Sequence, residues 1–356
     1  MLSPGRPGGP RAPSPGPAHP GRVTLIRPSG PPVPGTRAPL TRVPLSTAAL
    51  PPIDPRQPPW PGGLVTAGGV RLHVRRTAGP AAETAVYVHG LAGSSTNWTD
   101  LAGQLAVRCE GLAVDLPGFG RTPPPDGHDF SVLAHTDVLV RFLAGLGRGP
   151  VHLLGNSFGG TVAILTAATR PDLVRSLTLV SPAVPDRRPN PGRLSDRRLP
   201  LALLPGAVGR HYRSMLAAVT PSQRVEQMLR LCFANPDDVP EHRLAQAVDE
   251  YTERNGMPWA GDALGRTTVG LIRAWLAPRA RSLWRVLPQV PAPALVVWGT
   301  QDRLVSVRKA PRTAMLLPRG RLLVLPRTGH VAQMERPRSV ARAVLGMWEA
   351  VDRTEW

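Results

Sequence analysis

The sequence predicts an α/β protein whose mostly parallel central sheet is flanked by helices. Short apolar runs recur along the chain, and segments with helical spacing separate them. Strands that are apolar on both faces are typical of a sheet buried between helix layers, and alternation of strands with helices makes successive strands parallel. At 356 residues the chain is long enough to bury such a core.

The predicted strands share one plan, a short apolar run closed by polar or turn residues. The first two lie in residues 64–76 on either side of Gly68 and Gly69, which predict a hairpin. The later runs are apolar on both faces before their polar or turn residues, and they are expected in the buried part of the sheet. They are residues 84–90, 111–118, 151–157, 176–182, 294–302 and 321–330.

Helices are predicted between these runs. In residues 131–147 apolar side chains such as Leu139, Phe142 and Leu143 recur on one face, and Asp129 or Ser131 is a suitable cap. Other helices are predicted at 96–107, 158–169, 306–317 and 337–351.

One interval, residues 185–290, interrupts the alternation after the sixth strand. It holds no convincing strand, and its helices are predicted near 196–218, 222–233, 240–254 and 262–276. Long ordered insertions in compact domains are usually functional, so we interpret it as a helical lid. The two parts of the core are then residues 62–184 and 291–356.

Residues 1–61 differ from the rest in composition. They hold 19 of the 44 prolines and seven arginines, against one acid, Asp54. Because no helical or strand periodicity is present, we predict a disordered or polyproline-like tail. The segment lacks the apolar run of a signal peptide, and its early prolines do not suit a transit helix.

The net charge of +19 is spread along the chain and includes no dense basic run with interleaved aromatics. It therefore predicts no specific nucleic-acid partner. No window is apolar enough for a membrane span, and two cysteines, Cys109 and Cys232, are expected as free thiols in the cytoplasm. The histidines show no metal-ligand spacing, so neither a metal nor an organic cofactor is expected. The sequence does not indicate an oligomeric state.

A candidate nucleophile lies in Gly155-Asn156-Ser157-Phe158-Gly159. Ser157 comes where a buried strand ends and a helix begins, and glycines at 155 and 159 leave room for a strained turn there. The N-terminus of a helix also directs backbone N–H groups at a developing anion.

A serine hydroxyl needs a base, and the base needs an acid to orient it. Asp302 follows one predicted strand, and His330 follows the next. Two competing interpretations remain open: Asp302 is a helix cap, or Asp186 after the preceding strand is the acid. The chain order Ser157, Asp302, His330 is the order of α/β-hydrolase triads.

Over residues 62–351 the chain resembles the α/β-hydrolase superfamily, in its single-chain lidded branch. The resemblance rests on His89-Gly90, on Asp115 to Gly120, on Gly155 to Gly160, and on the Asp302 and His330 pair. It implies that Leu91 and Phe158 supply the two backbone N–H groups of an oxyanion hole. It also implies that His89, Gly90 and Asp115 shape the turns around the site rather than react.

The predicted function is serine-dependent hydrolysis of small to medium hydrophobic carboxylic esters through an acyl-enzyme. Serine at position 157 argues against the haloalkane dehalogenase and epoxide hydrolase branches, which have aspartate there. The turn is also similar to that of hydrolases that cleave carbon–carbon bonds of ring-cleavage products, although Val331 replaces their bulky aromatic residue. The same residues are compatible with a cofactor-free perhydrolase or haloperoxidase, and with a ligand-binding module that carries out no catalysis.

Overall fold

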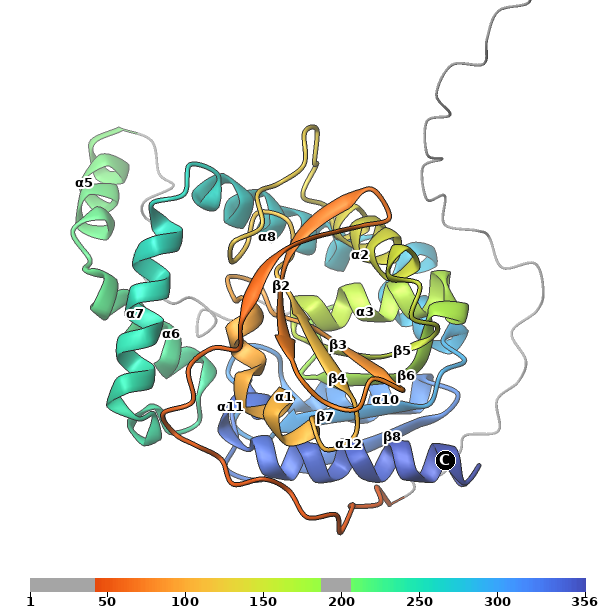
Figure 1. The fold of residues 1–356 in the computed structure, drawn as a ribbon. Coiled ribbons are helices and arrows are strands. Elements are labelled where there is room, and N and C mark those ends of the chain that lie inside the picture. The colour runs from red at the N-terminus through yellow and green to blue at the C-terminus, as the bar shows by residue number, and fades with distance from the viewer. Residues whose placement is uncertain (1–41, 187–205) are drawn as a thin grey trace, which may run out of the picture. The chain divides into compact units, whose positions relative to one another are not determined.

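The computed structural model describes residues 42–186 and 206–356. At its centre is an eight-stranded sheet with the strand order β1-β2-β4-β3-β5-β6-β7-β8 (Figure 1). β2 is antiparallel to β1 and to β4, and the other neighbouring pairs are parallel. The predicted mostly parallel sheet is therefore confirmed. The strands are β1 (Gly62–Ala67), β2 (Val70–Thr77), β3 (Thr84–Val88), β4 (Glu110–Val114), β5 (Val151–Asn156), β6 (Val174–Val180), β7 (Ala294–Gly299) and β8 (Gly320–Leu325).

The burial of the strands follows their place in the sheet. Every residue of β3, β5 and β7 is buried, as expected for strands covered on both faces. The edge strands are more open: five of the six residues of β1 are exposed, and β8 is only partly buried. The predicted hairpin is confirmed, since β1 and β2 pair around Gly68 and Gly69 with positive φ angles.

Helices cover both faces of the sheet. One apolar cluster joins a face of the sheet to α2 (Val132–Leu146), α3 (Phe158–Thr169) and α10 (Ala310–Leu316). A second cluster joins the opposite face to α1 (Thr99–Leu105), α11 (Ala332–Glu335) and α12 (Pro337–Asp352). The helices predicted at 131–147, 158–169 and 337–351 are confirmed. Those predicted at 96–107 and 306–317 begin as the 3₁₀ turns Ser95–Trp98 and Val307–Lys309 before continuing as α1 and α10.

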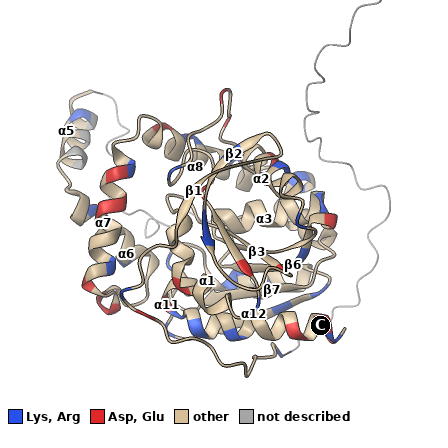
Figure 2. Ribbon diagram, in the orientation of Figure 1, with Lys and Arg blue, Asp and Glu red and all other residues tan. Residues whose placement is uncertain are grey.

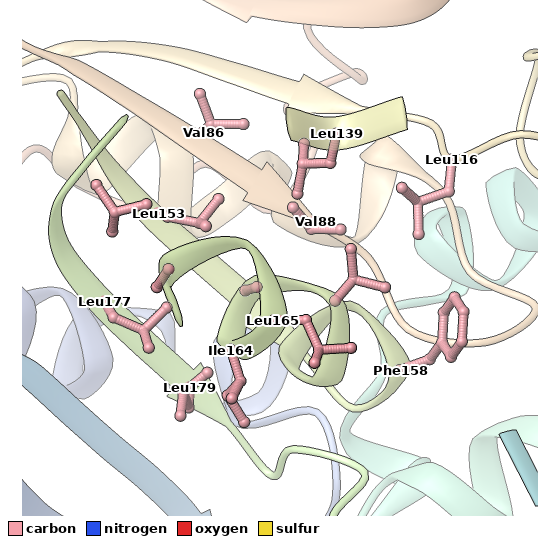
Figure 3. Packing of buried hydrophobic residues seen from close by; sticks show 14 of the residues in the cluster. Val86, Val88, Leu116, Leu139, Leu153, Phe158, Ile164, Leu165, Leu177 and Leu179 are labelled. Atoms are coloured by element: carbon pink, nitrogen blue, oxygen red, sulfur yellow. The ribbon is translucent and has the colours of Figure 1, made fainter. Parts of the chain in front are cut away.

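The packing of α3 matters most for function. Figure 3 shows Phe158 and Ile164 of this helix among the apolar side chains of the neighbouring strands, such as Val88 and Leu179. Both helix residues are fully buried. Since burying a large apolar side chain contributes about 1.5–3 kcal/mol, this contact holds the start of α3, and the residue before it, against the sheet.

Between β6 and β7 the described residues form only helices and turns, and we call residues 206–290 the helical insertion. Its α-helices are α5 (Gly206–Ala217), α6 (Pro221–Cys232), α7 (Glu241–Asn255), α8 (Ala260–Leu276) and α9 (Leu283–Val286). The 3₁₀ turns are Pro236–Asp238, Arg279–Arg281 and Leu287–Gln289. The predicted helices at 222–233, 240–254 and 262–276 match α6, α7 and α8. The one predicted at 196–218 lies partly outside the described residues.

The prediction of a disordered tail over residues 1–61 is wrong for residues 42–61. Val43 and Leu50 are buried in the second cluster. The N–H of Ser46 donates to the Arg342 carbonyl at 2.9 Å, and the Trp60 indole donates to the Thr99 carbonyl at 2.8 Å. An extended segment held by single apolar residues has no periodic pattern, which is why composition alone suggested a free tail. Residues 1–41 lie outside the described part.

Basic and acidic residues are interspersed along the described elements, as the blue and red parts of the ribbon in Figure 2 show. Both cysteines are free, with Cys109 buried and Cys232 partly so. Among the described helices, none combines the length and the apolar character that crossing a membrane would require.

Candidate active site

Ser157 occupies a strained turn between β5 and α3. Its backbone angles are φ 50° and ψ −115°, a conformation that costs a residue with a Cβ atom about 1–3 kcal/mol. Hydrogen bonds on both sides hold it there. Its N–H donates to the Val180 carbonyl at 3.0 Å, and its carbonyl accepts from Thr161 at 3.1 Å and from Ala183 at 2.9 Å.

The glycines on either side of Ser157 are required by close backbone approach. A Cβ atom on Gly155 would lie 2.5 Å from the Gly159 carbonyl oxygen, and one on Gly159 would lie 2.3 Å from the Val88 carbonyl oxygen. Neither glycine has a positive φ, so the strain is confined to the serine itself. The small neighbours let α3 turn back directly over the strand ends.

His330 and Asp302 meet in the loops that follow β8 and β7. The His330 Nδ1 atom lies 2.9 Å from Asp302 Oδ2, and both side chains are buried. The other carboxylate oxygen, Oδ1, accepts from the N–H groups of Leu304 and Val305, each at 2.9 Å. Asp302 therefore orients the imidazole and shapes its own loop at once, while the next helix is capped by Ser306.

The rival acid, Asp186, has a different neighbour. Its carboxylate lies 3.5 Å from the Lys309 ammonium group, and it is buried beyond the end of β6. Of the two carboxylates, Asp302 is the one hydrogen-bonded to His330.

The Ser157 turn and the His330 loop are in contact through Asn156. The Asn156 side-chain amide donates to the His330 carbonyl at 3.2 Å and to the Val180 carbonyl at 3.0 Å. The Ser157 hydroxyl itself makes no hydrogen bond to a described residue, the His330 imidazole included. Such bonds often tighten only when substrate is bound.

The two predicted oxyanion-hole residues, Phe158 and Leu91, lie in the segments that adjoin the serine. Phe158 is the first residue of α3, and the N–H groups of a first helical turn have no partner within the helix. Leu91 follows Gly90, at which a Cβ atom would lie 3.3 Å from the Ser157 Cβ atom. Within residues 42–186 and 206–356 neither N–H group donates a hydrogen bond.

His89 is held as a structural residue. Its Nδ1–H donates to the Gly90 carbonyl at 2.7 Å, and its Nε2 accepts from the Leu116 N–H at 3.0 Å. Because a carbonyl can only accept and an N–H can only donate, these partners fix one neutral tautomer. Burial lowers the pKa of His89, which agrees with an uncharged ring that joins two loops.

Asp115 ties the loops together from the end of β4. One oxygen accepts from the Ser95 N–H at 2.6 Å, and the other accepts from His73 Nδ1 at 2.8 Å and from the Arg121 N–H at 2.9 Å. Burial alone raises its pKa, but these hydrogen bonds outweigh the burial and hold the pKa of Asp115 below its ordinary value.

Replacing Asp115 with asparagine is expected to lower the free energy of unfolding by about 2–3 kcal/mol, because an amide NH₂ would face a backbone N–H. A carboxylate whose pKa is lowered in the folded state stabilises the fold at pH values above its pKa in the unfolded state. This stabilisation is lost as the pH falls through the pKa of the folded state. The free energy of unfolding, measured with urea between about pH 7 and about pH 3, should therefore fall less steeply with pH in the variant than in the wild type. The exposed control Asp126→Asn should change stability by less than about 0.5 kcal/mol. An equal loss in both variants would contradict this role for Asp115.

Sequence reasoning missed several residues beside the site. Arg254 of α7 donates to the carbonyl of Ala92, which lies just after Leu91 and has a φ of 60°. Glu335 and Arg303 join the loops of His330 and Asp302 to the helical insertion. No local signal identifies them, since their partners are contributed by segments far away in the chain.

The sequence matches the family described as "alpha/beta hydrolase fold" over residues 86–337, which is more than half of the chain. The chain belongs to the α/β-hydrolase family. The predicted superfamily is thereby confirmed, and a hydrolase is the class of enzyme that this membership supports. No group of three or more His, Cys, Asp or Glu side chains among the described residues of this α/β hydrolase could hold a metal ion.

Similar proteins include lipases and other hydrolases. The chain is 27% identical to the monoacylglycerol lipase abhd6-B of Xenopus laevis over 274 residues, covering 75% of this chain and 76% of the relative. A putative lipase from Acinetobacter baumannii has a similar fold, with a TM-score of 0.67 at 23% identity, over 83% of this chain and 93% of that one. The 2-hydroxy-6-oxo-6-phenylhexa-2,4-dienoate hydrolase of Rhodococcus sp. strain RHA1 also has a similar fold, with a TM-score of 0.64 at 19% identity. The match covers 82% of this chain and 100% of that one.

Proposed function

We propose that this α/β hydrolase is a serine hydrolase that cleaves carboxylic esters of small to medium hydrophobic substrates, with Ser157, His330 and Asp302 as its catalytic triad. The observation that carries the proposal is the 2.9 Å hydrogen bond between His330 and Asp302. The loop of His330 also contacts Asn156, the residue before the strained Ser157. The lipase named among the relatives supports ester hydrolysis.

In the proposed mechanism, His330 Nε2 takes the proton of the Ser157 hydroxyl as its oxygen attacks the ester carbonyl carbon. The negative charge that develops on the carbonyl oxygen is held by the N–H groups of Leu91 and Phe158; such a donor contributes about 2.7–4 kcal/mol to the transition state. The imidazolium, stabilised by Asp302, then protonates the leaving alcohol. Water, deprotonated by His330, attacks the acyl-enzyme and releases the acid.

The helical insertion supports a substrate of moderate size, and we propose that it acts as a lid. A cavity of about 290 Å³ lies between the insertion and the loop that follows Leu91. Its lining combines the apolar side chains of Leu229, Phe233, Met257 and Met334 with Ser94, Ser95 and charged side chains that include Glu250 and Arg254. Ser157 does not line this cavity, so we propose that it holds the part of the substrate distant from the scissile bond.

The test is covalent labelling with a fluorophosphonate probe, which reacts with activated serines. We expect one labelled peptide containing Ser157, and hydrolysis of p-nitrophenyl esters that depends on acyl chain length. A folded protein that is not labelled would contradict the mechanism. A ring-cleavage dienone, assayed in parallel, tests carbon–carbon bond hydrolysis, which predicts faster turnover of the dienone than of every ester.

We also propose a cytoplasmic location, because both cysteines are free thiols. Cell fractionation tests this proposal.

A further inference from the structure

The end of α6 lies directly against the loop that carries His330. We call residues 232–234 the α6 exit. The His330 N–H donates to the Cys232 carbonyl at 2.7 Å. The approach is close, because a Cβ atom on Gly329 would lie 2.4 Å from that same carbonyl oxygen and 2.7 Å from the Ala234 nitrogen. The helical insertion and the histidine loop are therefore in backbone contact here.

One carboxylate bridges the two segments. Glu335 Oε1 accepts from the Gly329 N–H at 2.7 Å, and its Oε2 accepts from the Ala234 N–H at 2.9 Å. Gly329 is the residue before His330, and Ala234 lies 101 positions before Glu335. A carboxylate that accepts two backbone N–H groups fixes the distance between them, and these charge-assisted bonds are stronger than bonds between neutral groups.

A guanidinium group makes the matching contact from the other loop. Arg303, the residue after Asp302, donates to the Phe233 carbonyl at 3.1 Å and to the Ala234 carbonyl at 3.4 Å. Glu335 thus binds an N–H group of the α6 exit while Arg303 binds its carbonyl groups. Gly329, which precedes His330, and Arg303, which follows Asp302, are thus both linked to the α6 exit, Gly329 through the Glu335 carboxylate.

We propose that Glu335, together with Arg303, is a positioning pair that holds the His330 loop on the α6 exit and so sets the place of the imidazole relative to Ser157. The inference rests on the proposed function. Neither residue is expected to touch substrate. The pair makes this end of the helical insertion part of the catalytic framework, so that any opening of the insertion must occur away from α6.

The test measures the rate constant of fluorophosphonate labelling on the full chain, well below its melting temperature. Glu335→Gln places an NH₂ group against one of the two backbone N–H groups, so we expect labelling to slow by about 10- to 100-fold, the effect of a displacement near 1 Å. The matched control is Glu110→Gln. Glu110 is also buried, and it pairs with Arg76 and Arg148 at the start of β4, whereas Ser157, Asp302 and His330 follow the carboxyl ends of their strands. The Glu110→Gln protein should lose stability but keep its labelling rate within about twofold of the wild-type rate.

Two further measurements make the outcome decisive. Arg303→Met removes the guanidinium of an exposed residue and should slow labelling in the same direction, which decides the matter if Glu335→Gln does not fold. The pH profile of labelling should also shift in both variants, since a displaced imidazole has altered contact with Asp302. Rates and profiles equal to wild type in folded variants would overturn the inference alone, whereas a wild-type protein without labelling would overturn the proposed function first.

Discussion

Replacing Ser157 with alanine is expected to lower kcat for p-nitrophenyl ester hydrolysis by about 10⁴- to 10⁶-fold, because the attacking oxygen is lost while the oxyanion donors remain. KM should change little, since the hydroxyl contributes little to ground-state binding. The hydroxyl has no hydrogen bond to a described residue, and alanine meets the same backbone strain at a φ of 50°. The melting temperature should therefore stay close to that of the wild type.

The chain offers a matched control in Ser181. This serine follows the neighbouring strand β6, has a φ of 43°, and its buried hydroxyl has no partner among the described residues. Ser181→Ala should keep kcat within about twofold of wild type, as expected for a hydroxyl outside the chemistry. Comparable losses in both variants, or a folded Ser157→Ala protein that retains most of its activity, would show that the nucleophile lies elsewhere.

The centre of the sheet could be predicted from sequence because strands such as β3, β5 and β7 are buried on both faces. The apolar run 151–154 with its polar end is typical of a buried parallel strand, and the observed β5 ends at Asn156, one residue before the serine. The least accurate boundary is that of β8, predicted as 321–330 and observed as Gly320–Leu325. The residues after Leu325 leave the sheet because they form the loop that carries His330, so the error falls on the functional segment.

The candidate site was predictable only in part. Ser157 has a local signal, since the glycines around it answer a steric need. Asp302 was the predicted acid, but Asp186 also follows a buried strand, and only spatial contact with His330 distinguishes the two. Glu335 was not predictable, because its partner Ala234 lies in an insertion whose placement depends on tertiary packing.

Replacing Asp302 with asparagine is expected to lower kcat by about 10⁴-fold, as in other serine triads in which this change reverses the histidine tautomer. The reversal follows from the contacts of the carboxylate. Oδ1 accepts two backbone N–H groups, from Leu304 and Val305, so the asparagine carbonyl oxygen must take that side. The NH₂ group then faces His330 Nδ1, which becomes an acceptor. The imidazole proton then lies on Nε2, so this nitrogen can no longer accept the proton of the Ser157 hydroxyl.

The control for Asp302 is the rival acid itself. Asp186→Asn weakens the contact with Lys309 but leaves the 2.9 Å bond of His330 in place, so kcat should stay within about threefold of wild type. Steady-state kinetics on one ester at neutral pH distinguish the two, with melting temperatures to exclude unfolding. If the loss followed Asp186 instead, the histidine would have to change its partner during turnover, and the observed Asp302 contact would describe a resting state only.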